Sequence, residues 1–96
     1  MAVTGALTPE VARAVDALTE FGATEVYLFG SVLTSSWEPE SDLDVAVVGL
    51  RPEAFFRAMA RVSDIVRRRV DLVDLGQDTP FTRYLRSHGE ELLRVR

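Results

Sequence analysis

The segment Asp42-Leu43-Asp44 places two carboxylates two residues apart in the chain. On a strand both carboxylates lie on one face, roughly 6.5–7 Å apart along it, and Leu43 points to the opposite face. Two like charges at one edge repel each other, which costs stability unless a cation lies between them. Asp71, in a later apolar run, can supply a third carboxylate. Three carboxylates without His or Cys suit a hard, oxygen-preferring ion such as Mg²⁺ or Mn²⁺.

The dipeptide Gly30-Ser31 supplies groups that suit phosphates. Glycine lets the backbone approach a phosphate closely, and the Ser31 hydroxyl can add a hydrogen bond to a phosphate oxygen. A short helix over residues 31–36 would direct free N–H groups at the same anion. Two metal ions about 3.5–4 Å apart on the carboxylates would activate a hydroxyl and steady a leaving pyrophosphate. We therefore predict an anion site that faces a metal-binding carboxylate cluster.

The composition excludes several other chemistries. The chain has no Cys, which rules out disulfides, thiol nucleophiles and zinc-thiolate sites. All 11 basic residues are Arg, so neither Schiff-base chemistry nor a Walker-A loop is available, because both need a lysine amine. The single His, His88, cannot form a multi-histidine metal site. The net charge of −4 argues against a general nucleic-acid-binding surface, which needs clustered basic side chains.

The 96 residues are expected to form one domain over residues 1–96, because a chain of this length supports a single modest core. No basic stretch followed by an apolar run opens the sequence, so no secretory signal is visible. No apolar run approaches the roughly 20 residues that span a bilayer. We therefore expect a cytoplasmic protein without membrane contact.

Three strands and three helices are expected to position these residues. Short β-branched and aliphatic runs predict the strands, and proline after a capping residue together with helical apolar spacing predicts the helices. The expected strands cover residues 25–29, 42–48 and 69–75. The expected helices run from Pro9 to about Gly22, from Pro52 to about Arg67, and from Pro80 through Leu92. The order α-β-β-α-β-α indicates an α/β (α+β) class.

The connections between the predicted strands indicate a mixed sheet of about three strands with helices packed on it. An antiparallel pairing of the first two strands brings Gly30-Ser31 near Asp42. The second and third strands are joined through a helix, as parallel neighbours usually are. With the helices on one face, the three aspartates and Gly30-Ser31 would gather at one end of the sheet.

The motif as a whole resembles the signature of the polymerase-beta-like nucleotidyltransferases. Gly30-Ser31, ten intervening residues and Asp42-x-Asp44 match its pattern, and the flanking runs LFGS, SDLDVAVV and RVDLVDL fit as well. Asp71 falls on the third carboxylate of that family. Because the resemblance covers nearly the whole chain, the sequence looks like a minimal nucleotidyltransferase, the partner of HEPN-domain proteins. Many members continue after Gly-Ser with an Arg-Gly pair, which is absent here, and an arginine of the run 67–69 could compensate.

The resemblance implies a Mg²⁺-dependent transfer of a nucleoside monophosphate, AMP from ATP above all, to a hydroxyl. Asp42 and Asp44 would hold two Mg²⁺ ions, with Mn²⁺ as an alternative. Asp71 would hold the catalytic ion and help to deprotonate the acceptor, and Gly30 and Ser31 would bind the β- and γ-phosphates. The implied partner is a HEPN-domain ribonuclease toxin, which this chain would neutralise as a type VII-like antitoxin by modifying a toxin tyrosine.

Two other functions remain open at this point. The chain could be a non-catalytic antitoxin that neutralises its toxin by binding alone, although an unused carboxylate cluster only costs stability. It could also be a nucleotidyltransferase for a small hydroxylated molecule.

Several further residues have a structural interpretation and a functional one. Asp74 lies three residues after Asp71, which predicts the opposite face of the strand and a structural role. His88 lies on an apolar helical stripe, so we expect it to pack or to face a partner rather than to serve Ser31 in a catalytic triad. The Arg run 67–69 reads as a solvated helix end or a phosphate clamp, and Trp37 as a cover for the core or a stacking partner for a base.

Overall fold

The computed structural model describes residues 8–33, 41–89 and 92–96. Its elements in chain order are α1 (Pro9–Glu20), β1 (Glu25–Phe29), the 3-10 helix η2 (Gly30–Leu33), β2 (Leu43–Val48), α2 (Pro52–Val66), β3 (Val70–Asp74), α3 (Pro80–Ser87) and β4 (Leu93–Arg94). The predicted α-β-β-α-β-α order is confirmed. The short helix expected over residues 31–36 occurs as η2, and residues 34–36 of that prediction lie outside the described ranges.

Proline begins each α-helix because its fixed φ suits the first helical position and its missing N–H would have no intrahelical partner there. Thr8 caps α1 and Thr79 caps α3, since their side chains accept backbone N–H groups of the first turn. Among the described residues, no helix has the length and apolar character needed to cross a bilayer.

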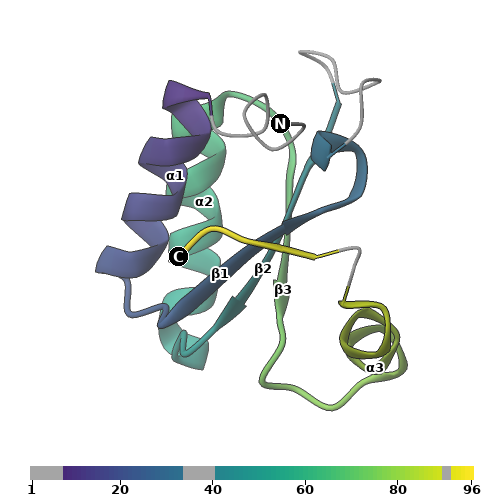
Figure 1. Cartoon of the computed structure of the whole chain (residues 1–96). Coiled ribbons are helices and arrows are strands. Elements are labelled where there is room, and N and C mark those ends of the chain that lie inside the picture. The colour runs from purple at the N-terminus through teal and green to yellow at the C-terminus, as the bar shows by residue number, and fades with distance from the viewer. Residues whose placement is uncertain (1–7, 34–40, 90–91) are drawn as a thin grey trace.

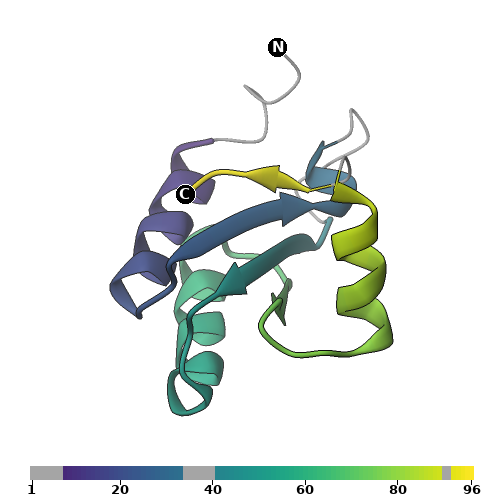
Figure 2. The ribbon, with the colours of Figure 1, turned by 60° about the horizontal axis from the view of Figure 1, so that its bottom comes forward.

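The four strands form one mixed sheet in the order β3-β2-β1-β4. β1 and β2 are antiparallel, and β2 and β3 are parallel, as predicted from their connections. The register pairs Phe29 with Asp44 and Asp44 with Asp71. The last residue of β1 and the first residues of β2 and β3 therefore meet at one end of the sheet. Figure 2 shows β4, β1 and β2 side by side.

The two faces of the sheet carry separate hydrophobic clusters. α1 and α2 pack on one face over the larger cluster, which includes Val26, Leu28, Leu43, Val45 and Leu72. α3 lies on the opposite side of the sheet, as Figure 1 shows. The smaller cluster there is formed by Phe29, Ala46, Leu75 and Leu85. The expectation that all helices lie on one face is therefore wrong for α3, because strand residues alternate between faces and enough of the second set is apolar to bury that helix.

The strand β4 is an addition to the three predicted strands, and it replaces the end of the predicted last helix. α3 ends at Ser87, with His88 as its C-cap, so it does not continue through Leu92. β4 pairs antiparallel with β1, placing Tyr27 opposite Arg94 and Leu28 opposite Leu93. The run from Leu92 to Arg96 is too short to show a period of its own, and the free edge of β1 decides its conformation.

Candidate active site

Asp44 and Asp71 lie directly beside each other on the parallel strands β2 and β3. Neighbouring strands are about 4.8 Å apart, so two carboxylates in the same register and on the same face come close together. The pKa of Asp44 is raised to about 6, first by burial, then by the charge of Asp71, a side-chain hydrogen bond with Asp71 and the charge of Asp42. Asp44 therefore keeps its proton to a higher pH than an ordinary carboxyl group, because it is partly buried and lies against a second carboxylate.

Asp42 lies just before β2, at the same end of the sheet as Asp44 and Asp71. Leu43 between the two aspartates is fully buried, with 0% of its surface exposed, which is the predicted alternation. The chain around Asp42 is held by the connection between α2 and β3: Arg68 donates a hydrogen bond to the Ser41 carbonyl at 2.9 Å, and the Leu43 amide donates to the Arg69 carbonyl at 2.9 Å. Two residues of the Arg run thus fix the backbone on both sides of Asp42.

Gly30 begins η2 immediately after the residue that pairs with Asp44. Its φ of +75° lies in the left-handed region that favours glycine. A Cβ at this position would overlap Oδ2 of Asp44 and lie 3.0 Å from its Cγ. Gly30 is therefore required by both its backbone conformation and the closeness of the Asp44 carboxylate. Ser31 is half-buried beside it, in the first turn of η2.

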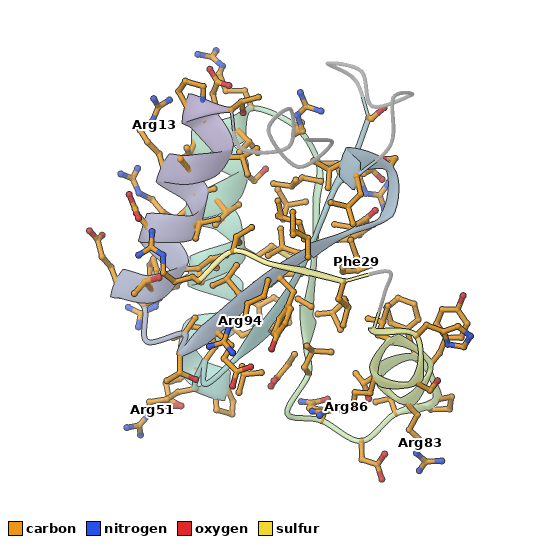
Figure 3. The ribbon with its side chains drawn as sticks, viewed as in Figure 1. Arg13, Phe29, Arg51, Arg83, Arg86 and Arg94 are labelled. Atoms are coloured by element: carbon orange, nitrogen blue, oxygen red, sulfur yellow. The ribbon has the colours of Figure 1, made fainter. Side chains whose placement is uncertain are left out.

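A cleft of about 460 Å³ opens at Asp44 and Asp71. Aromatic side chains wall this cleft, supplied by β1, by α2 and by the start of α3: Phe29, Phe55, Phe56 and Phe81. Phe29 and Phe81 pack against each other with ring centroids 6.0 Å apart, and Phe29 faces the side of the sheet on which α3 lies (Figure 3). The site therefore combines a carboxylate pair with an aromatic wall.

The donor chemistry fits a hard cation, although the side chains do not converge fully. All three candidate ligands are oxygen donors, and burial together with the charges of Asp71 and Asp42 raises the pKa of Asp44. A cation at this place would offset the repulsion between the carboxylates. Within the described ranges, however, no three His, Cys, Asp or Glu side chains are arranged to hold a metal ion. The structure thus brings Asp44 and Asp71 together and leaves Asp42 at the margin.

Asp74, His88 and Arg67, which the sequence also singled out, have positions within the fold that account for them without a catalytic role. Asp74 accepts a hydrogen bond from the Gly76 amide at 2.8 Å and so caps the turn after β3, as expected of a structural residue. His88 stacks on Tyr84, with ring centroids 4.2 Å apart, and its Nδ1 lies 2.8 Å from the Tyr84 carbonyl within the same helix segment. Arg67 is exposed at the left-handed C-cap of α2. Trp37 lies outside the described residues.

The aromatic wall is the part of the site that sequence reasoning missed. The sequence pattern predicts Phe55 and Phe56 as core residues that could extend into a partner surface, and Phe81 as one position of an apolar stripe. A usable signal was present: Phe55 and Phe56 are adjacent, and neighbouring helical positions cannot both face one core. Phe56 is 71% exposed, which confirms that one of the two points outward.

A family model described as polymerase beta, nucleotidyltransferase matches residues 18–94. The matched range contains the turn at Gly30-Ser31 and the three aspartates. A search of curated proteins finds no significant match.

Solved structures share the fold. A chain from a toxin-antitoxin crystal structure with AMP-PNP has a TM-score of 0.73 and 23% sequence identity, with coverage of 91% of this chain and 72% of that chain. A chain from tri-AMPylated Shewanella oneidensis HEPN toxin in complex with MNT antitoxin has a TM-score of 0.66, 22% identity and coverage of 90% and 68%. A candidate minimal nucleotidyltransferase has a TM-score of 0.69, 25% identity and coverage of 88% and 91%.

Proposed function

Because the chain belongs to the polymerase beta nucleotidyltransferase family, we propose that it transfers AMP from ATP to a hydroxyl group and releases pyrophosphate. The observation that carries the proposal is the Asp44–Asp71 pair, which two adjacent strands hold beside Gly30. This arrangement places two carboxylates next to a glycine turn, and partial burial followed by the charge of Asp71 raises the pKa of Asp44, as is common for groups at functional sites.

In the proposed reaction the acceptor oxygen bonds to the α-phosphorus of ATP, and the bond from that phosphorus to the bridging oxygen breaks. Asp71, the more exposed of the pair, accepts the hydroxyl proton. Asp42, Asp44 and Asp71 would hold two Mg²⁺ ions, or Mn²⁺ in their place, and bound Mg²⁺ would neutralise charge on the phosphates. Gly30 and Ser31 position the β- and γ-phosphates, so the protein contributes mainly orientation and electrostatics.

We propose a HEPN-domain toxin as the protein partner and a tyrosine hydroxyl on it as the acceptor. Support comes from the fold shared with chains of toxin-antitoxin structures, one with AMP-PNP and one with an AMPylated HEPN toxin. The aromatic wall beside Asp44 and Asp71 also suits a ring-bearing acceptor better than a polyhydroxylated one.

The test is an incubation of the chain with Mg²⁺, labelled ATP and a HEPN-domain protein, read by intact mass. We expect the HEPN protein to gain one or more AMP units. Asp44→Asn should lower the rate on the order of 100-fold or more, because it removes a charge that acts in the transition state. Asp64→Asn is the matched control, because Asp64 is an exposed aspartate of α2 that does not line the cleft, and it should keep full activity.

The same variants test the alternative function, neutralisation of a toxin by binding alone. The incomplete convergence of the three aspartates is the observation that favours this alternative. If Asp44→Asn protects cells from the toxin as well as the unmodified chain does, and no AMP is transferred by either, the proposed activity is wrong. Loss of protection together with loss of transfer supports the enzyme.

A further inference from the structure

A second cavity, of about 400 Å³, adjoins the cleft at Asp44 and Asp71. The two cavities share lining from Phe55 and Phe56 of α2 and from Leu72 and Val73 of β3. The second cavity then continues past Asp74 to Thr79 at the start of α3. The shared lining makes the two cavities one continuous depression, which we call the β3 groove.

The β3 groove follows the outer edge of the sheet. β3 is the terminal strand of the order β3-β2-β1-β4, so within the described residues its one strand partner is β2. Phe55 and Phe56 come from the helix on one face of the sheet, whereas Phe29 and Phe81 lie on the other face. A depression lined by both sets must cross the edge of β3. The distance along β3 from Asp71 to Asp74 is about 10 Å, the length of three extended residues.

The groove has an apolar surface that is open to solvent. Phe56 is 71% exposed and stands edge-on to Phe55, with ring centroids 5.4 Å apart. The polar groups at the far end are used within the fold: the Thr82 hydroxyl lies 2.6 Å from the Gln77 carbonyl, and the Thr82 amide donates to the Thr79 hydroxyl. Exposed aromatic surface beside a reaction cleft is typical of a site that binds a partner chain.

The charges of the groove disfavour a nucleic acid as the acceptor. The charged side chains that line the two cavities, as far as the chain is described, are Asp44, Asp71 and Asp74, and no Arg is among them. A nucleic acid would bring phosphates against these carboxylates with no basic residue to neutralise them. An extended polypeptide with apolar side chains has no such penalty.

We propose that the β3 groove binds the acceptor as an extended polypeptide segment. Phe56 anchors an apolar side chain of that segment, and the hydroxyl-bearing residue a few positions away reaches Asp71. This inference rests on the proposed function and adds to it the surface that selects the acceptor. It makes Phe56, an aromatic residue of the cleft wall, a determinant of acceptor specificity.

The experiment compares Phe56→Ser with Tyr84→Ser, using a purified HEPN-domain protein as the acceptor. Tyr84 is 47% exposed on α3 and lines neither cavity, so its substitution removes exposed aromatic surface elsewhere. Both side chains are exposed, and both variants should fold, which circular dichroism checks. We expect Phe56→Ser to lower kcat/KM for the HEPN protein at least 10-fold and to weaken its binding by a similar factor in EDTA without nucleotide. ATP affinity should be unchanged, and Tyr84→Ser should match the unmodified chain.

Four results would overturn the proposal. Unchanged kcat/KM and affinity in Phe56→Ser would show that the acceptor binds elsewhere, and an equal loss in Tyr84→Ser would show a diffuse interface. A loss of ATP affinity in Phe56→Ser would assign the groove to the nucleotide. A dimer of the chain alone that Phe56→Ser dissociates, seen by light scattering, would assign it to a second copy. If the unmodified chain binds the HEPN protein but transfers no AMP, only the proposed function fails, because the EDTA binding comparison still tests the groove.

Discussion

Asp44 is a residue whose charge opposes folding while its chemistry supports the proposed reaction. Its pKa of about 6 in the folded chain lies above the ordinary value of 3.8, so the folded state favours the protonated form. The stability that this side chain contributes is complete below about pH 3.8 and is lost as the pH rises through about 6. At pH 8 without metal, the fold therefore carries an ionised Asp44 against Asp71.

We predict that Asp44→Asn raises the free energy of unfolding at pH 8 in EDTA by about 1 kcal/mol, a value reduced for solvent screening because the side chain is partly exposed. The gain should shrink as the pH is lowered through about 6 and should vanish near pH 4. Urea unfolding at pH 5 and pH 8 measures it. Asp74→Asn serves as the control for the same substitution elsewhere in the sheet, and a destabilised Asp44→Asn at pH 8 would contradict the repulsion argument.

Gly30 is the second residue at which the site constrains the backbone. We predict that Gly30→Ala lowers the free energy of unfolding by about 2 kcal/mol, since a non-glycine residue is strained at positive φ and the added methyl group overlaps the Asp44 carboxylate. AMP transfer should fall with it, because Asp44 must move. Gly89→Ala is the matched control: a Cβ there meets nothing within 4 Å, and its unfolding should change by less than about 0.5 kcal/mol.

At the scale of elements, the end of α2 holds the chain that leads into the candidate site. α2 ends at Val66, and Arg67 adopts the left-handed conformation with φ 56° and ψ 44°. This turn directs Arg68 to the Ser41 carbonyl, next to Asp42. The left-handed Arg67 thus connects α2 to Arg68, whose hydrogen bond holds the chain next to Asp42.

We predict that Arg67→Gly stabilises the protein by about 0.5–1 kcal/mol, because glycine adopts the left-handed C-cap at little cost. The same substitution in the helical interior, Arg61→Gly, should destabilise it by about 1 kcal/mol. Thermal melts of the two variants give opposite signs if the backbone argument holds. Equal destabilisation in both would mean that the Arg67 side chain matters more than its conformation.

At the scale of the whole molecule, the sheet brings the site together from three separate parts of the chain. Gly30 directly follows β1, β2 contributes Asp44 and β3 contributes Asp71, and these residues meet only when all three strands are paired. A ligand that binds at this end of the sheet therefore links all three strands and stabilises the fold against global unfolding.

We predict that Mg²⁺ with a non-hydrolysable ATP analogue raises Tm. Ligand at 100 times its Kd adds about 2.7 kcal/mol, and about 4–8 °C per kcal/mol is typical of a domain of this size. EDTA should remove the shift. Asp44→Asn should lose most of it, while Asp74→Asn should keep it. An equal shift in both variants would place nucleotide binding away from the carboxylates.

Most elements were predictable because their signals are local. Proline after Thr8 and Thr79 marks two helix starts, and the buried and half-exposed residues of β2 alternate around Leu43 as predicted. The parallel pairing of β2 and β3 also followed from the intervening helix, and it placed Asp44 next to Asp71. These features depend on residues close together in the chain or on connection rules that apply to most folds.

The remaining features depend on contacts between distant segments. The short run at β4 becomes a strand only because β1 offers it an open edge, and α3 takes the second face only because Phe29, Ala46 and Leu75 form an apolar patch there. By itself the sequence determined the family motif, the strand order along the chain and the candidate carboxylates. The tertiary structure decided which side chains share the cleft, including the exposed ring of Phe56, because packing across the sheet leaves no local signal in the chain.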